Sequence, residues 1–182
     1  EDVKLGGVIM FAVRSFAVGG KGVRFLGRAR FSTKSPTVIF SWGDGSDGQL
    51  GHAKFQKINA GLMSDRYIQA EPRKLVKSKR FTQCSVGDGY TLGITSTNDL
   101  FGWGNGFVGE AQSNEPVPIQ PGLKVKAVSA GPKHCAAIDM DGQVYTWGHG
   151  GSWLSGGGQL GHGDTKKVEA PKMVDSFKQY GA

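Results

Sequence analysis

Residues 37–51 read TVIFSWGDGSDGQLG, an apolar and aromatic run that ends in Trp-Gly and a glycine-rich turn. The pattern returns as DLFGWGNGFVG at residues 99–109 and as GQVYTWGHGGSWLSGGGQLG at residues 142–161. Recurrence of one phrase within a chain is the sequence signature of a repeat architecture. The three copies therefore predict a fold assembled from similar units, in which most of the conspicuous aromatic and glycine residues belong to the scaffold.

A gapless internal alignment supports the repeat. Residues 71–105 lie on residues 115–149 when they are shifted by 44 positions, with apolar residues on apolar residues and glycines on glycines. Tyr90 falls on His134 in this alignment, which indicates a packing or hydrogen-bonding role at that position. The residues that we assign to the repeat scaffold are Trp42, Gly43, Trp103, Gly104, Trp147, Gly148, Gly87, Gly131 and His134.

Each repeat should contain four short strands. In the second repeat we expect them at residues 73–77, 81–86, 90–95 and 99–103, separated by Gly, Ser, Thr, Asn and Lys. The connections are too short for crossover helices, so the sheets should be antiparallel. Four-stranded sheets that repeat radially are the blades of a β-propeller. We therefore predict an all-β fold with about two to three blades; a β-sandwich is the alternative, although a sandwich requires no sequence repeat.

The order of these elements resembles the repeat of the regulator-of-chromosome-condensation family over about residues 36–174. The matching pieces are SWGDGSDGQLG at 41–51, SVGDGYTLGIT at 85–95, VSAGPKHCAAID at 128–139 and the YTWGHG and GQLGHG elements within 145–163. In the second copy, residues 109–112 (GEAQ) are expected to take the place of GQLG. The resemblance implies a seven-bladed propeller. This chain holds too few repeats to close such a ring, so we expect a piece of a larger propeller, a truncated product or a piece completed by a partner.

The resemblance also bears on light sensing. Plant ultraviolet-sensing members of the family place a photoactive Trp in a Gly-Trp-Arg-His-Thr element. The corresponding elements here read GDGYT at residues 87–91 and GPKHC at residues 131–135, without the Trp. The sequence therefore argues against a light-sensing role.

Positive charge is concentrated at the start of the chain. Residues 1–35 hold seven Lys and Arg and two acidic residues, a net charge of +5, whereas residues 36–182 hold fifteen and thirteen, a net charge of +2. A stretch rich in Arg and poor in acids is typical of a mitochondrial or plastid transit peptide. We therefore expect residues 1–35 to be a disordered transit-peptide-like leader, residues 36–182 to be the repeats, and the protein to be mitochondrial, with a plastid as the alternative. The longest apolar run, at residues 8–13, is too short to span a membrane.

Residue patterns for catalysis, metal binding or cofactor binding are missing from the sequence. His52 and His162 both follow GQLG, so they are features of the repeat. A zinc site needs about four Cys, His or acidic ligands at suitable spacing. The glycine-rich residues 148–161 contain no Gly-Lys-Ser or Gly-Lys-Thr and are not a phosphate loop. We predict no enzyme, no catalytic residue, no metal and no cofactor.

Protein binding is the predicted function, because repeat scaffolds recognise partners through loops on one face. The candidate contacts are Phe55, Arg66 and Tyr67 in a long insert at residues 52–71, and Trp153 in the extended third turn. We expect a scaffold or assembly factor of an organellar complex. Exchange of guanine nucleotide on a small GTPase is one alternative, implied by the resemblance alone.

Organellar RNA processing is the other alternative. It would depend on a local basic cluster, Arg73, Lys74, Lys77, Lys79 and Arg80. The small net charge of residues 36–182 argues against a large nucleic-acid-binding surface. The solvated surface of a strand and a turn is the simpler interpretation of the cluster.

Overall fold

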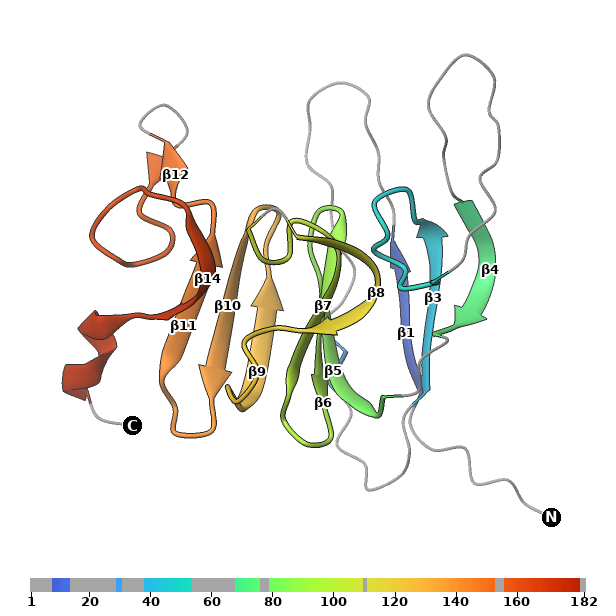
Figure 1. Ribbon diagram of the computed structural model, residues 1–182, viewed down its shortest axis with the longest axis horizontal. Coiled ribbons are helices and arrows are strands. Elements are labelled where there is room, and N and C mark those ends of the chain that lie inside the picture. The colour runs from blue at the N-terminus through green and yellow to red at the C-terminus, as the bar shows by residue number, and fades with distance from the viewer. Residues whose placement is uncertain are drawn as a thin grey trace.

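Three sheets lie side by side, in chain order, along the long axis of the molecule (Figure 1). The computed structural model describes residues 8–13, 29–30, 38–53, 68–75, 79–109, 111–152 and 156–180. Within these ranges the chain forms strands, turns and one 3₁₀ helix, η1 (Asp175–Tyr180), and no α-helix. The predicted all-β class and the four-stranded antiparallel blades are confirmed.

The second and third sheets each contain a four-stranded antiparallel blade. The second blade consists of β5 (Phe81–Val86), β6 (Tyr90–Thr95), β7 (Leu100–Asn105) and β8 (Gln112–Pro118), and the short β2 (Ala29–Arg30) is added beside β5. The third blade consists of β9 (Val125–Ala130), β10 (His134–Asp139), β11 (Val144–Gly148) and β14 (Val168–Met173). A small hairpin of β12 (Gly151–Ser152) and β13 (Gly156–Gly157) projects between β11 and β14 (Figure 1).

The first sheet holds the first Trp-Gly strand. Its order is β1 (Val8–Val13), β3 (Val38–Asp44) and β4 (Ile68–Lys74), and we call it the first blade. β1 runs parallel to β3, in the place that β6 and β10 take beside β7 and β11. Two pieces of the expected leader, β1 and β2, are thus strands, which differs from the disorder expected there. The Val, Ile and Phe content of β1 suits a strand. Import through residues 1–35 stays a prediction.

The grouping of strands into repeats that we expected from the sequence is wrong. The strand predicted at residues 73–77 is β4, and it pairs with β3 of the preceding unit instead of with β5. A chain returning from the glycine-rich turn meets the free edge of the strand it has just left, so it pairs there as a hairpin. β8 and β14 pair with β7 and β11 in the same way.

The third blade is therefore complete. β14 is its fourth strand and lies beside β11. Val174 is buried and Val168 packs against the core, whereas Phe177 is exposed.

The hydrophobic core lies between the blades. One cluster joins the first and second blades and contains Ile39, Leu50, Leu75, Phe81, Cys84, Phe101 and Trp103. The other joins the second and third blades and includes Tyr90, Leu92, Ile94, Phe107, Val125, Val128 and Trp147. Two side chains of β5 also bond to β9: Gln83 Nε2 donates to the carbonyl of Val128 at 2.8 Å, and Ser85 Oγ accepts from the N–H of Ala130 at 2.9 Å. Buried polar groups are thereby satisfied across the interface.

Candidate protein-binding surface

The Trp-Gly element anchors each later blade to the blade before it. The indole Nε1 of Trp103 donates to the carbonyl of Gln49 at 2.9 Å, and that of Trp147 donates to the carbonyl of Phe107 at 2.8 Å. Both tryptophans are fully buried, whereas Trp42 is half-buried. The glycines that follow have φ angles of 107° at Gly43, 99° at Gly104 and 104° at Gly148. Only glycine adopts this left-handed backbone without strain, so the Trp-Gly pair forms a structural unit.

A hydroxyl and a histidine make the same contact in the first and third blades, which we call the latch. Its members are Ser41 with His52 in the first blade and Thr146 with His162 in the third. The hydroxyl oxygen lies 2.9 Å from the ring Nε2 in the first latch and 3.0 Å in the third. Each hydroxyl also donates to a leucine carbonyl of the turn, Leu50 at 2.7 Å and Leu160 at 2.5 Å. The latch therefore ties the glycine-rich turn to the Trp-Gly strand.

The second blade has a glycine where the latch hydroxyl stands. The strand register places Ser41 opposite Arg73 and Thr146 opposite Lys172, but Gly102 opposite Val117. A Cβ added at Gly102 would collide with the ring of Phe107 and would lie 2.8 Å from Cδ1 of Ile119. The absence of a side chain at Gly102 thus makes room for Phe107. The hydroxyl–histidine pair of the other two blades is replaced here by an apolar contact.

The turn of the second blade is formed by residues 106–109 (GFVG), and the alignment that placed residues 109–112 there is wrong. Gly48 and Gly51 have φ angles of 85° and 71°, and Gly106 and Gly109 have 77° and 56°. The carbonyl after the first glycine accepts an indole N–H in both turns. Gly48 follows Trp42 by six positions, whereas Gly106 follows Trp103 by only three. The shorter spacing places the glycine-rich turn of the second blade three residues earlier than the sequence alignment did.

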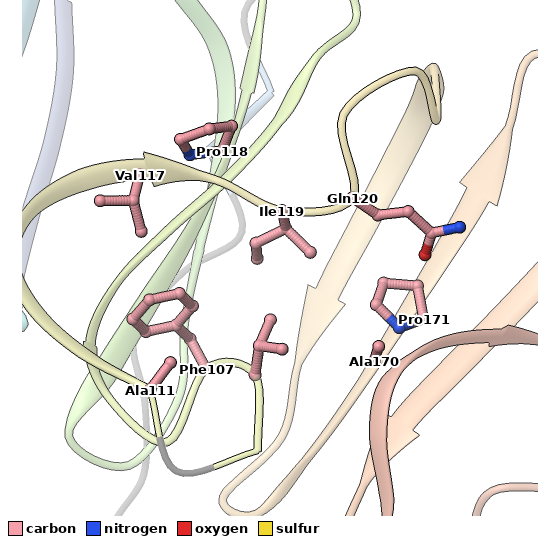
Figure 2. Close-up of a pocket in the computed structure, with 9 residues that line it drawn as sticks. Phe107, Ala111, Val117, Pro118, Ile119, Gln120, Ala170 and Pro171 are labelled. Carbon is pink, nitrogen blue, oxygen red and sulfur yellow. The ribbon is translucent and has the colours of Figure 1, made fainter.

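An apolar cleft opens beside this altered turn, between the second blade and β14 of the third (Figure 2). Its volume is about 360 Å³. It is lined by Phe107, Val108, Ala111, Val117, Pro118, Ile119 and Gln120 from the second blade and by Ala170 and Pro171 from the third. Of these lining residues only Gln120 has a polar side chain. A concave, apolar site of this size is suited to apolar side chains of a ligand or a protein partner.

The expected basic cluster lies on β4 and in the residues just before β5. Arg73, Lys74, Lys79 and Arg80 are exposed there, and Lys77 lies outside the described residues. The Nζ of Lys79 lies 4.5 Å from the centroid of the Phe101 ring, a cation–π contact. Part of this charge is therefore used in packing within the second blade.

The remaining titratable groups favour structural roles. Burial raises the pKa of the Cys84 thiol, and it raises that of Cys135 to about 12, so both thiols stay protonated near neutral pH. Within the part of the chain that the structure describes, no group of three or more His, Cys, Asp or Glu is placed to hold a metal ion.

The described residues also contain no helix that is long and apolar enough to cross a membrane.

Other residues singled out by sequence take these positions. The hydroxyl of Tyr90 donates to the carbonyl of Gly131 at 2.7 Å, across the interface between the second and third blades. A Cβ added at Gly131 would lie 2.9 Å from Cε1 of the half-buried His134, and one added at Gly87 would collide with Tyr90. These glycines allow a close approach of ring and backbone.

The proposed partner contacts Phe55, Arg66, Tyr67 and Trp153 lie outside the described residues. The structure instead brings Phe107, Val117 and Pro171 together, which the sequence argument did not single out. The available signal was a break in the repeat, namely glycine in place of the hydroxyl at position 102.

Known proteins share this repeat. Family models described as the regulator of chromosome condensation (RCC1) repeat match residues 38–94 and 125–152. The ultraviolet-B receptor UVR8 of Arabidopsis thaliana is 30% identical over 153 residues, which are 79% of this chain and 32% of the receptor. The human E3 ubiquitin-protein ligase HERC2 is 27% identical over 93% of this chain and 3% of the ligase. Human RCC1 domain-containing protein 1 is 25% identical over 76% of this chain and 46% of that protein.

Solved structures give the same fold. Human WBSCR16 superposes with a TM-score of 0.56 and 24% identity, over 75% of this chain and 33% of that chain. Prp20p of Saccharomyces cerevisiae superposes with a TM-score of 0.59 and 21% identity, over 74% and 33%. Its structure was described together with its binding to Gsp1p and histones. The chain thus spans about a third of the ultraviolet-B receptor and of these solved chains.

Proposed function

Because this chain is a member of the regulator-of-chromosome-condensation repeat family, we propose that it is a protein-binding scaffold or assembly factor that acts in mitochondria. Its relatives are named as a light receptor and as ubiquitin ligases. The shared part is the repeat, and the activity of a site depends on individual residues rather than on the fold. Protein binding is the function that needs only the repeat surface.

The observation that carries this proposal is the apolar cleft between β8 and β14. Binding energy at protein interfaces is concentrated in a few apolar anchors that fill such hollows. The cleft occurs where the repeat is broken, so it is a property of this sequence and not a by-product of the scaffold. The apolar lining of the cleft and its position at a departure from the repeat together support a role in recognising a protein partner.

A cross-linking experiment tests the binding role. A photoreactive amino acid replaces Ala170 on the cleft wall, and in a matched variant it replaces the exposed Asp164. In a mitochondrial extract we expect discrete adducts from position 170 and none of the same mass from position 164. Identical adducts from both positions, or none from either, would contradict a scaffold that binds through the cleft.

The mitochondrial location is supported by the net charge of +5 in residues 1–35. A fusion of residues 10–35 to a fluorescent reporter should colocalise with a mitochondrial marker. A matched fusion in which Arg24, Arg28 and Arg30 are replaced by Glu should remain in the cytosol. A uniform cytosolic signal from the unaltered fusion would rule out import by this segment.

Exchange of guanine nucleotide stays an alternative. A nucleotide-release assay on mitochondrial small GTPases separates the two activities, because a scaffold should leave the rate of nucleotide release unchanged.

A further inference from the structure

We propose that the glycine-rich turn of the third blade, residues 158–161 (GQLG), binds a tryptophan indole, and that a second copy of this chain supplies this indole from Trp42 of its first blade. The inference goes beyond the proposed protein-binding function, because it names a contact between copies on the side of the third blade that faces away from the second. It is carried by a comparison of the three glycine-rich turns, of which the first two each hold an indole.

The turn of the third blade has the same conformation as that of the first. Gly48 and Gly51 have φ angles of 85° and 71°, and Gly158 and Gly161 have 83° and 72°. The N–H of the second glycine donates to the carbonyl of the first glycine in both turns, at 3.0 Å and 2.9 Å. The latch ties both turns to their Trp-Gly strands. What the first turn binds, the third turn is therefore shaped to bind.

The carbonyl that accepts an indole in the first turn has a counterpart in the third. The carbonyl of Gln49 accepts from Nε1 of Trp103 at 2.9 Å, and Gln159 stands at the position of Gln49. Among the residues that the structure describes, none donates to the carbonyl of Gln159. An indole has a donor and no acceptor, so this carbonyl offers what an indole requires.

The glycine after this carbonyl leaves room for the ring. A Cβ added at Gly51 would lie 3.0 Å from Nε1 of Trp103 and 3.2 Å from its Cδ1, so the indole lies directly against this glycine. A Cβ added at Gly161 would meet, among the described residues, only Cγ1 of Val174 at 3.3 Å. Gly51 is buried and Gly161 is exposed. The third turn thus has the slot for an indole, and no described residue of the same chain fills it.

One face of the third blade lies open around the slot. On β10 the half-buried His134, Ala136 and Ile138 alternate with the buried Cys135 and Ala137. In β6, which has a blade on either side, all six residues are buried. The alternation therefore shows a strand that is covered on one face, toward the second blade, and less covered on the other.

The open face is apolar beside the slot. Val144 stands where the first two blades have Ile39 and Leu100, because each of the three accepts a hydrogen bond from the residue that follows the fourth strand. Ile39 and Leu100 are buried in the clusters between blades, whereas Val144 is half-buried. Ile138 pairs in register with Val144 and adds to this surface. Covering such a surface gains free energy in proportion to its area.

The first blade carries the matching half of the contact at the other end of the molecule (Figure 1). Phe40 and Trp42 have on β3 the positions that Phe101 and Trp103 have on β7. Phe101 and Trp103 are buried against the first blade, whereas Phe40 and Trp42 are half-buried. Nε1 of Trp42 donates to no residue that the structure describes. One chain therefore presents an indole donor at one end and an indole acceptor at the other.

A contact between these two ends is heterologous, and such contacts form a ring where the rotation between copies closes. The rotation between neighbouring blades is that of a propeller, and propellers have about four to eight blades. Two copies with three blades each fall within this range. We therefore expect a closed dimer in which each copy places Trp42 against Gln159 of the other.

The test measures the mass of the full chain by sedimentation at chain concentrations up to about 100 μM, where a weak dimer is detected. We expect a dimer. Trp42→Ala removes the indole, and Gly161→Asn fills the slot with a residue that tolerates positive φ. Each should raise the dissociation constant at least about tenfold. The matched control is Gly163→Asn, where φ is 83° and an added Cβ meets no described residue within 4 Å, so the dimer should persist.

A mixture of the two variants tests the direction of the contact. Chains with Gly161→Asn still carry Trp42, and chains with Trp42→Ala still carry the open turn. Mixed in equal amounts, they should form a dimer through one intact contact, although neither variant does so alone. A contact between two identical surfaces would not be restored in this way.

Four results would overturn the inference. The first is a monomer at every concentration, and the second is a dimer that both variants leave unchanged. The third is a mixture that does not associate. The fourth is a monomer whose melting temperature falls with Gly161→Asn and not with Gly163→Asn, because a residue of the same chain would then fill the slot. Cross-links from position 170 report on the cleft between the second and third blades, so the proposed protein-binding function is decided separately.

Discussion

The second and third blades each consist of four equivalent strands, yet they differ at one pair of positions that face each other across the third and fourth strands. In the third blade Thr146 faces Lys172 and closes a latch with His162. In the second blade Gly102 faces Val117, Phe107 takes the space of the missing side chain, and a cleft lies alongside. The Trp-Gly unit and its indole hydrogen bond are the same in both.

This difference separates two kinds of residue in a repeat protein. Those that join one blade to the next recur, because every interface has the same requirement. Other side chains can differ between blades when a neighbour changes with them, as Phe107 fills the space left at Gly102. Both positions are buried, and together with Val117 on β8 they lie beside the cleft.

The largest expected effect concerns what the blades share. Trp103→Ala and Trp147→Ala should each lower the free energy of unfolding by about 3–5 kcal/mol, since each empties a buried aromatic site. Trp42→Ala, at a half-buried position, should cost less. Urea unfolding of the three variants measures the differences. A loss below about 0.5 kcal/mol for both buried sites would show that these residues are not core.

The next prediction concerns Gly102, the position at which the second blade differs. Gly102→Ser restores the hydroxyl of the other blades, but the new Cβ collides with Phe107, so we expect a loss of about 1–3 kcal/mol from overpacking. Combining it with Phe107→Gln removes the collision, so the double variant should lose less than the sum of the two single losses. A double-mutant cycle measured by thermal unfolding gives the coupling. Strict additivity would mean that Gly102 and Phe107 changed independently.

A smaller effect is expected for the latch. Thr146→Val and Ser41→Ala each remove a hydroxyl that donates to a leucine carbonyl, and each should lower the free energy of unfolding by about 1 kcal/mol. Gly102→Ala in a Phe107→Ala background adds a methyl group of similar size at the second blade and serves as the comparison. If neither hydroxyl deletion changes the free energy of unfolding, the latch does not contribute to stability.

The smallest effect is a pH dependence. Burial, with the nearby Arg73 cation, lowers the pKa of His52 below its ordinary value of 6.5. The unfolded chain then binds more protons than the folded chain in the window just below pH 6.5. Stability is therefore full above that pH and falls as the pH drops through the window, by at most about 1.4 kcal/mol per pH unit. His52→Gln should flatten this slope in thermal unfolding measured from pH 7 to 5; an unchanged slope would contradict the assignment.

Sequence periodicity predicted the blades well, because the Trp-Gly strand and its hairpin partners are local. The bounds expected for β5 and β6 match the structure. The fourth strand was assigned to the wrong unit because its partner lies across a glycine-rich turn, and the alignment of a repeat has no information about where one sheet ends. The cleft was missed for a related reason: Gly102 and Val117 are unremarkable as single residues, and their meaning depends on the register that places them opposite each other.

The carbonyl of Gln49 joins two buried donors to a single turn. It accepts both the indole N–H of Trp103 and the hydroxyl of Thr91, each at 2.9 Å, so one turn of the first blade satisfies two buried donors of the second. At the next interface the donors run both ways, because Trp147 of the third blade donates to the second, whereas Gln83 and Tyr90 of the second blade donate to the third. Removing the blade on either side of the second one would therefore leave buried donors of the second blade without acceptors, so its stability should depend on both neighbours.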